Sequence, residues 1–366
     1  MAKKYIYHRD DWPELAFDQG AIGEALSLVY LTQGKLFGKL DALGFDVQNK
    51  LLLGTVSDEI MSSFEIEGER LNVSGVRSSV ARRLGLENAG LTTISPDHYT
   101  EGVVEMALEA TQNYSASLTD ERLFGWHAAL FPTGRSGIHR IVAGGWRPKE
   151  IEIVYGPLGH EKVHFRGPAP ERVPSEMKYF LEWLEGGQNI DPFVKAGLAH
   201  LRFEAIHPFE DGNGRIGRAI ADLQLARAEK TPYRYYSLSS QFLKERKAYY
   251  SELESATKFS GDATMWLIWF LGSLVRAMKA SEAILEKAKE KARYFEKWKN
   301  ISINERQLKI VNMLLDGFEG KLTTSKWAKL CKCSHDTALR DIENLIGKKV
   351  LARSKEGGRS TSYDLI

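Results

Sequence analysis

Hydrophobic positions recur at helical spacing over much of this chain. Between residues 40 and 71 they fall four residues apart, with one adjacent pair, at Leu43, Val47, Leu51, Leu52, Val56, Ile60 and Phe64. This period predicts a long helix. Gly68 follows the run, and glycine commonly follows the last turn of a helix. The segment from Ser63 to Gly68 is therefore expected at the end of that helix.

One segment before the C-terminal part has the alternating pattern of strands. Within residues 138–166, Ile151, Ile153 and Tyr155 alternate with polar residues, and 163–165 can form the returning strand. The pattern predicts a single β-hairpin there. Helical spacing precedes it over residues 99–131 and follows it over 175–299. The last part of that stretch, 279–300, is highly charged and is expected to be a solvated linking helix.

The last 66 residues change pattern again. They predict helices over 305–315, 325–332 and 335–348, then strands over 350–353 and 362–365. Ser334 is placed to cap the third helix. This order resembles a winged helix-turn-helix. The basic residues that could meet phosphates along the third helix and the wing are Arg340, Lys348, Lys349, Arg353, Lys355 and Arg359.

Composition sets the broad class. The chain has 366 residues, of which 43% are hydrophobic and 27% charged, as in globular proteins of two or three domains. Net charge is +2, but residues 301–366 carry 12 Lys and Arg against 8 Asp and Glu. The two cysteines are too close together for a disulfide framework, and the N-terminus lacks an apolar signal segment. These features predict a cytoplasmic protein.

Two other site types are not favoured by the sequence. The most apolar stretch, residues 265–275, is shorter than the roughly 18–20 residues that a bilayer span needs, so no membrane association is expected. Cys331, Cys333 and His335 lie close together, but they offer no fourth ligand for zinc. A structural or incidental role is expected for all three.

The densest chemistry lies in residues 207–218, His-Pro-Phe-Glu-Asp-Gly-Asn-Gly-Arg-Ile-Gly-Arg, between two predicted helices. His207 can accept a proton from an attacking hydroxyl. Asp211 offers a hard oxygen ligand for Mg²⁺. Gly212, Asn213 and Gly214 let backbone N–H groups approach an anion where a helix begins. Arg215 and Arg218 share one helix face and can bind successive phosphates.

Each of these residues taken alone fits a glycine-rich turn with solvated arginines. Taken together, in this order, they exceed what a turn requires. Other nucleotide-binding signatures are missing: the sequence contains no G-x-x-x-x-G-K-[ST] loop, and a Rossmann fingerprint would need a preceding strand.

The segment resembles the motif of the Fic family, HPFx[DE]GNGRxxR, at every fixed position, and the resemblance extends over about residues 50–275. It implies a helical core with a short hairpin, and transfer of AMP from Mg·ATP to a Ser, Thr or Tyr hydroxyl of a target protein. It makes His207 the general base and Asp211 the Mg²⁺ ligand. Gly212, Asn213 and Gly214 would form the anion hole, Arg215 and Arg218 would bind ATP phosphates, and Phe209 would be a buried anchor.

The motif separates AMP transfer from some of the family's other reactions and not from others. The family branch that phosphorylates its targets has Lys in place of the second motif glycine, and Gly214 disfavours it. Phosphocholine transfer, known in a few relatives, stays open.

Residues 63–68, Ser-Phe-Glu-Ile-Glu-Gly, resemble the family's inhibitory motif, [ST]xxxE[GN]. The resemblance implies that Ser63 and Glu67 are regulatory and that the Glu67 carboxylate takes the place of the ATP γ-phosphate on Arg218. It also allows the reverse reaction, removal of AMP, with Glu67 aligning water.

Two further features resemble parts of the family. The hairpin at about 145–155 lies where the family has its flap, whose edge can pair with an extended segment of the target. Tyr249 and Tyr250 resemble a tyrosine pair near the adenine, although core tyrosines are an alternative reading. Thr257 stands where some relatives have Asn.

We therefore expect a mainly α protein with a helical region over residues 1–98, a Fic core over 99–278, a linking helix over 279–300 and a winged helix over 301–366. The last of these could contact DNA, form a homodimer or dock a protein. The rival function is a DNA-binding transcription regulator whose Fic core senses a nucleotide.

Overall fold

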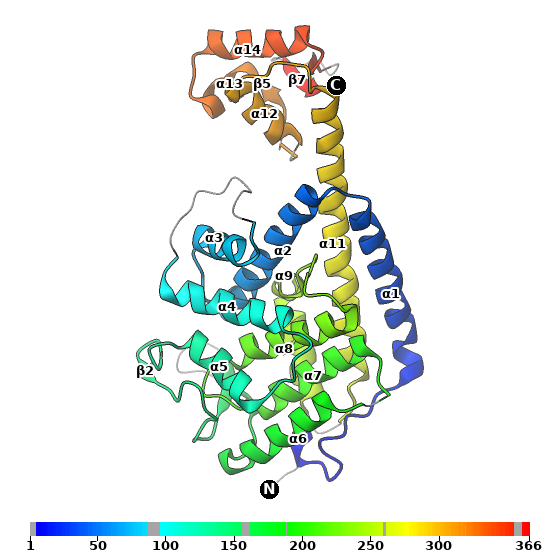
Figure 1. Cartoon of the computed structure of the whole chain (residues 1–366), viewed down its shortest axis with the longest axis vertical. Helices are drawn as coiled ribbons and strands as arrows, with labels where there is room; N and C mark the ends of the chain where they lie inside the picture. Colours follow the sequence, from blue (N-terminus) through cyan, green and yellow to red (C-terminus); the bar gives the residue numbers. More distant parts are fainter. Residues whose placement is uncertain are drawn as a thin grey trace. The chain divides into compact units, whose positions relative to one another are not determined.

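The computed structural model describes residues 5–86, 96–155, 162–187, 189–258, 261–315, 317–318, 320–354 and 361–366. These form two compact units, Met1–Glu282 and Ala283–Ile366 (Figure 1). A single helix, α11 (Thr264–Lys297), contains the boundary between them. The charged segment predicted as a linking helix is thus mostly the second half of α11.

The N-terminal helices are α1 (Gln19–Asp41), α2 (Phe45–Ile66) and α3 (Val73–Arg83), after a short 3₁₀ turn, η1 (Ile6–His8). Asp18 begins α1 by accepting hydrogen bonds from the N–H groups of Gly20 and Ala21. The long helix predicted over residues 40–71 is α2, and it ends at the expected place. Gly68, with φ +85°, follows its C-cap.

The segment predicted as helical over 99–131 forms two helices, α4 (His98–Gln112) and α5 (Asp120–Leu130). The break follows from a second cap: the Thr119 hydroxyl accepts a hydrogen bond from the N–H of Arg122 and starts a new helix. Helical periodicity on both sides of the break concealed it in the sequence.

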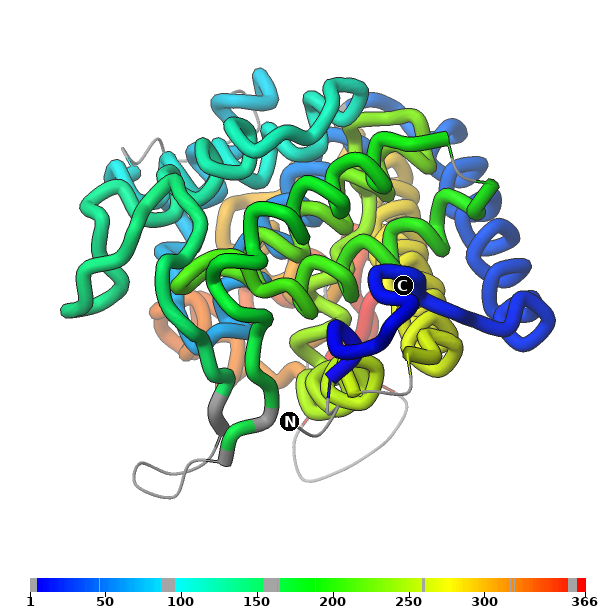
Figure 2. Tube along the Cα trace, turned by 90° about the horizontal axis from the view of Figure 1, so that it is seen from below, coloured from blue at the N-terminus to red at the C-terminus, as the bar shows by residue number. Residues whose placement is uncertain are grey.

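The hairpin predicted near 151–165 is β3 (Glu152–Tyr155) paired antiparallel with β4 (Lys162–Arg166), with Ile153 opposite Phe165. It extends away from the helices (Figure 2). The expectation of one strand pair in this part of the chain was wrong, because β1 (Arg135–Ser136) and β2 (His139–Arg140) also pair. Strands of two residues are too short to leave an alternating pattern.

Helices then follow to the end of the first unit: α6 (Val173–Glu185), α7 (Pro192–Ile206), α8 (Asn213–Glu229), α9 (Leu238–Lys244), α10 (Arg246–Ala256) and α11, with a 3₁₀ turn, η2 (Pro170–Arg172), before α6. At the centre, α7 and α8 pack together and are buried on most sides. Their core includes Phe64, Trp126, Phe180, Phe203 and Ile220. The loop that joins α7 to α8 is therefore held between two well-packed helices.

The second unit contains α12 (Glu305–Leu315), β5 (Leu322–Thr323), α13 (Thr324–Cys331), α14 (His335–Gly347), β6 (Leu351–Arg353) and β7 (Ser362–Leu365). Sequence predicted all of these except β5, which completes a sheet of order β5-β7-β6. Ser334 caps α14 as expected, accepting from the N–H of Thr337. Trp327 and Ile342 are central in its core. Lys355 and Arg359 lie outside the described residues.

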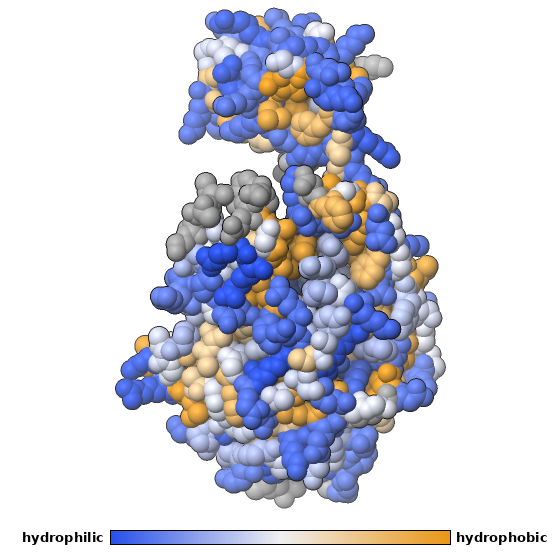
Figure 3. Space-filling model, viewed as in Figure 1, coloured by the Kyte–Doolittle hydropathy of each residue, from blue (hydrophilic) through white to orange (hydrophobic). Residues whose placement is uncertain are grey.

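The hydropathy of the surface does not single out a functional site. Hydrophilic residues cover most of the visible face of each unit, with smaller groups of hydrophobic residues among them (Figure 3). In the described part of the chain, no helix is both long and apolar enough to cross a bilayer. Cys331 and Cys333 are free thiols, and among described residues no three His, Cys, Asp or Glu side chains converge to hold a metal.

Candidate active site

The loop that joins α7 to α8 is a closed turn held by its own side chains. It begins at His207 and ends at Gly212, both with positive φ (51° and 81°). Asn213 Oδ1 accepts a hydrogen bond from the N–H of Phe209 at 2.9 Å, and Asn213 Nδ2 donates to the Phe209 carbonyl at 2.8 Å. Phe209 is fully buried beneath the loop. These contacts fix the backbone between His207 and the start of α8.

Replacing Asn213 with Ala is expected to lower the free energy of unfolding by about 2 kcal/mol or more, because two buried backbone groups of Phe209 would lose their partners. Urea unfolding followed by circular dichroism measures this. Asn113→Ala is the matched control, since the Asn113 side chain makes one exposed hydrogen bond, to the Glu109 carboxylate. Equal losses in the two variants would show that Asn213 does not brace the loop.

The first turn of α8 faces an anion, and in this structure the anion is a carboxylate. N–H groups in the first turn of a helix have no helical acceptor and favour negative charge. A Cβ added at Gly214 would lie 2.3 Å from Glu67 Oε1. Glu67 therefore lies directly against Gly214, one of the residues predicted to bind phosphate.

Arg218 binds the same carboxylate. Its Nη2 lies 2.8 Å from Glu67 Oε1 and 2.7 Å from the Ser63 carbonyl, and its Nε donates to Ser63 Oγ at 2.9 Å. The Arg218 side chain is only 3% exposed. Burial alone would lower the pKa of Arg218, but the charge and hydrogen bond of Glu67, together with Tyr249 and Glu204, hold the pKa above its ordinary value. The three residues predicted to form the regulatory contact thus meet, with Ser63 and Arg218 buried and Glu67 partly exposed.

The turn after α2 presents a second carboxylate to the second arginine. The N–H of Glu69 bonds the Phe64 carbonyl and that of Gly68 bonds the Glu65 carbonyl, each at 3.0 Å. This is a Schellman motif, which uses the positive φ of Gly68. Glu69 Oε1 then accepts from Arg215 Nη1 at 2.8 Å.

Arg215 is held by more than Glu69. Its Nη2 donates to Asp211 Oδ1 at 3.2 Å, and its guanidinium carbon lies 5.2 Å from the ring centres of both Phe64 and Phe131. The Arg215 side chain is 2% exposed. Both arginines expected on phosphates therefore have carboxylate partners, supplied from either side of Gly68.

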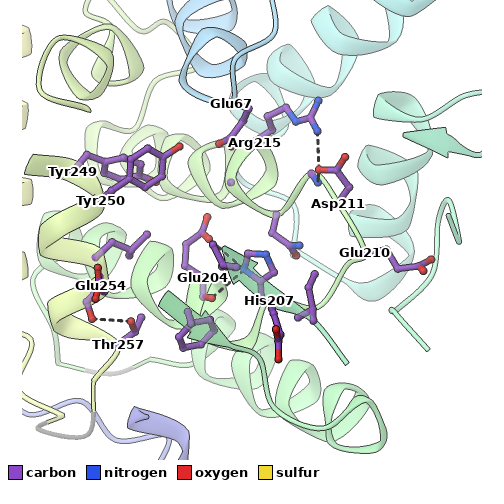
Figure 4. Close-up of a pocket in the computed structure, with 18 residues that line it drawn as sticks. Glu67, Glu204, His207, Glu210, Asp211, Arg215, Tyr249, Tyr250, Glu254 and Thr257 are labelled. Carbon is purple, nitrogen blue, oxygen red and sulfur yellow. Dashed lines mark hydrogen bonds and ion pairs between the residues drawn. The ribbon is translucent and has the colours of Figure 1, made fainter. Parts of the chain in front are cut away.

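His207 has the tautomer that a general base requires. Its Nδ1 lies 3.3 Å from the carbonyl oxygen of Glu204, an acceptor, so Nδ1 carries the proton and Nε2 is free to accept one (Figure 4). Burial lowers the pKa of His207 to about 4. The His207 carbonyl accepts from Arg147 Nε at 2.8 Å, which anchors the residue from the other side.

Asp211 has the surroundings of a cation ligand. Its Oδ1 accepts from the Gly212 N–H at 2.5 Å and from Arg215, and its Oδ2 accepts from the Ser136 hydroxyl. A carboxylate fixed at a turn predicted to bind phosphate would suit Mg²⁺, which takes one or two protein carboxylates and completes its shell with phosphate and water oxygens. The donor set at Asp211 fits that ion.

Glu67, His207 and residues 211–215 line one cavity of about 350 Å³. One wall holds His207 and the motif loop, and the opposite wall comes from α10. In Figure 4, Tyr249 and Tyr250 lie on the far side of the cavity from His207. The Tyr250 hydroxyl donates to the Ile66 carbonyl at 3.2 Å, whereas Tyr249 is buried and bonds His200. The cavity-lining residues from α10 and its end are Tyr249, Tyr250, Leu253, Glu254 and Thr257.

The hairpin forms another part of the cavity wall, through Ile151, Ile153 and Phe165. Its strand begins at Glu152 rather than near residue 145, because the preceding segment is tied to the motif loop. The Arg147 N–H bonds the Pro208 carbonyl, and its buried guanidinium bonds the carbonyls of His207, Lys149 and Pro168. The predicted flap thus consists of a segment around Arg147 that is bonded to the motif loop, followed by the short hairpin of β3 and β4.

Sequence reasoning missed five residues of this site: Glu69, His127, Ser136, Arg147 and Glu204. His127 shows why. Its Nδ1 accepts from the Gly144 N–H, its Nε2 donates to the Asp211 carbonyl at 3.2 Å, and its ring stacks on Phe209. Burial lowers its pKa to about 4, so the ring is neutral. Four of the five act through contacts between distant segments that no local pattern reveals. Glu204 is the exception, since its position one turn before His207 was a signal.

Comparison with known proteins gives two family matches. Residues 117–225 match the model of the Fic/DOC family, and residues 5–86 match a domain of unknown function, DUF4172. The first match includes α5, the hairpin, the motif loop and most of α8. The second includes the turn that carries Glu67 and Glu69.

Individual relatives were also found. A protein adenylyltransferase from Caenorhabditis elegans is 34% identical over 26% of this chain and 19% of its own length. A uridine 5'-monophosphate transferase from Xanthomonas campestris is 29% identical over 38% of this chain and 27% of its own length. The chain therefore spans about a fifth to a quarter of these relatives.

A crystal structure of a Fic family protein from Desulfovibrio desulfuricans has a TM-score of 0.57 and 20% identity, and covers 97% of this chain and 98% of that one. At this identity the likeness concerns the fold alone. It extends over nearly the whole length of both chains.

Proposed function

Because residues 117–225 form a Fic/DOC family domain, we propose that this chain is a protein adenylyltransferase that moves AMP from ATP to a Ser, Thr or Tyr hydroxyl of a target protein. The observation that carries the proposal is the convergence on one cavity of His207 with a free Nε2, the helix start at Gly212 to Gly214, and Asp211. The relative named as an adenylyltransferase supports the choice of AMP.

In this mechanism His207 Nε2 takes the proton of the target hydroxyl. The hydroxyl oxygen attacks the α-phosphorus of ATP, a new O–P bond forms, and the bond to pyrophosphate breaks. The amide groups at the start of α8 stabilise the charge that develops on the phosphate oxygens. Bound at Asp211, Mg²⁺ would neutralise charge on the triphosphate.

Arg218 is proposed to receive the γ-phosphate once Glu67 leaves it. As the structure stands, Glu67 accepts a hydrogen bond from Arg218 Nη2 and lies against Gly214, so a triphosphate cannot reach the same donors. Charge-assisted hydrogen bonds of this kind are roughly twice as strong as neutral ones. The Glu67 carboxylate therefore competes strongly with the γ-phosphate for Arg218. This makes Glu67 an autoinhibitory residue and Ser63 a support for Arg218. Tyr250 is proposed to lie against the nucleoside.

The outer edge of β3 is proposed to hold the target. Among described strands, β3 pairs only with β4, so its other edge can accept an extended segment by main-chain hydrogen bonds. Ile153 in this strand also lines the cavity, which brings such a segment near His207. The relatives' names give no support to DNA binding, and we do not propose it.

UMP transfer is the second candidate, favoured by the relative from Xanthomonas campestris. Incubation of the chain with ATP or UTP labelled at the α-phosphate separates the two. We expect label from ATP to enter protein, and an excess of unlabelled UTP to leave that labelling unchanged. Transfer from UTP with none from ATP would replace AMP by UMP in the proposal.

A further inference from the structure

Glu204 is a buried carboxyl in the cavity wall to which nothing above gives a role. It lies on α7 one turn before His207 and is 6% exposed. Its Oε2 is 3.6 Å from His207 Nδ1. Its Oε1 is inaccessible and, among the described residues, has no hydrogen-bond partner. Buried carboxyls are rarely left in this state, so the arrangement calls for an explanation.

The fold makes room for this carboxyl. A Cβ added at Gly217 on α8 would lie 2.7 Å from Glu204 Oε1, so the absence of a side chain at Gly217 creates its space. In Figure 4, Glu204 points into the region between His207 and the two tyrosines. Its carboxyl thus lies behind the imidazole, on the side of Nδ1, while Nε2 stays free for substrate.

We propose that Glu204 is a positioning residue that stabilises the imidazolium form of His207 while the target hydroxyl gives up its proton. This inference rests on the proposed transferase function. The hydroxyl O–H bond breaks and the proton binds His207 Nε2, while Nδ1 keeps its own proton and donates it in a hydrogen bond to the Glu204 backbone carbonyl. Glu204 gains and loses no bond. The His207 proton leaves to solvent after pyrophosphate and modified protein depart.

The electrostatic reason is burial. A charged imidazolium in this wall has lost most of its water, and the neutral Glu204 carbonyl compensates it poorly. An ionised carboxylate within 4 Å compensates it far better, by an amount that corresponds to about 10- to 100-fold in rate for a partly screened pair. The role resembles that of a carboxylate that orients and supports a catalytic histidine in other enzymes.

The charge of Glu204 depends on pH in a defined direction. Burial raises the pKa of Glu204 to about 8, so the carboxyl is protonated below that pH and ionised above it. Transfer should therefore increase as pH rises through the pKa of Glu204. The other titratable and charged groups near the pair are Arg218 and His200 behind it, Glu67 and Tyr249 across the cavity, and Arg147 and Asp211 beside His207.

The test uses Glu204→Gln and Glu204→Asp in the full chain carrying Glu67→Gly. Glu67 raises the pKa of Glu204, so in this background the rise in rate is expected at or below pH 8. Glu204→Gln should lower kcat about 10- to 100-fold, leave KM for ATP within about 2-fold and abolish the rise with pH. Glu204→Asp should recover part of kcat and the rise.

Glu176→Gln is the matched control. Glu176 is also 6% exposed, but it bonds Trp12 and Arg172 outside the cavity. Loss of this carboxylate should reduce stability and leave the pH profile unchanged. If Glu204→Gln keeps the rise with pH, or if Glu176→Gln loses it equally, the proposal is wrong.

A second measurement does not depend on activity. In protein with ¹³C-labelled imidazoles, the His207 resonance, identified by its loss in His207→Gln, should shift near or below pH 8 in the parent, because the Glu204 carboxylate then forms 3.6 Å from Nδ1. The shift should be lost in Glu204→Gln, and a parent without it would overturn the pairing. Absence of transfer in every variant, together with the expected shift, would overturn the transferase function and keep the pairing.

Discussion

Replacing Glu67 with Gly is expected to raise AMP transfer by about 10- to 100-fold. The change removes the carboxylate from Arg218 Nη2 and from the start of α8, where the γ-phosphate is proposed to bind. A hydrogen bond to a charged group contributes about 1.5–3 kcal/mol, which corresponds to this range of fold-change. Incorporation of label from ATP labelled at the α-phosphate measures it.

Glu65→Gly is the control for this experiment. Glu65 lies two residues earlier in the last turn of α2, and its side chain is about half exposed, 4.0 Å from Arg70. The substitution weakens the same helix end without freeing Arg218, so labelling should stay at the level of the unaltered chain. The inhibitory role of Glu67 is wrong if its variant binds ATP normally and gains no activity, or if Glu65→Gly gains as much.

The second large effect is expected at His207. In the Glu67→Gly background, His207→Ala should reduce labelling by about 10²- to 10⁴-fold, the usual contribution of a general base. Affinity for ATP should change little, because the predicted phosphate contacts come from α8 and not from the imidazole. Labelling and calorimetric titration with ATP measure the two quantities separately.

His98→Ala provides the comparison, since His98 is exposed at the start of α4. It should leave both labelling and ATP affinity unchanged. Transfer that persists in the His207→Ala variant would mean that another group accepts the proton. Loss of ATP binding in the same variant would mean that the ring supports the loop more than the reaction.

Much of this site could be predicted because its groups are close in sequence. His207, Asp211 and the glycines share one short loop, and the glycines mark the start of α8, which is a local property of the chain. The place of Glu67 followed from the end of α2 at Gly68, also a local feature. Its pairing with Arg218 was expected only from the family resemblance, and the structure has that contact. The catalytic and regulatory roles stay predictions.

The rest depended on contacts between distant segments. Glu69 reaches Arg215 across 146 residues, and Ser136 reaches Asp211 across 75. Short elements were missed for a different reason: β1, β2 and β5 have two residues each, too few for a period. The gap between α4 and α5 was hidden because a capping threonine can also occur inside a helix.

The turn at Gly68 has a consequence for how such an enzyme would be activated. Glu67 and Glu69 stand on either side of one glycine, in a motif closed by two backbone hydrogen bonds, and each neutralises a different arginine. Opening that motif would release both side chains in a single event, which leaves Arg218 without its carboxylate partner and Arg215 with Asp211 alone. A polyanion entering the cavity would then restore neutrality. Activation should accordingly behave as an on/off transition coupled to nucleotide capture, with few enzyme molecules in a half-open form.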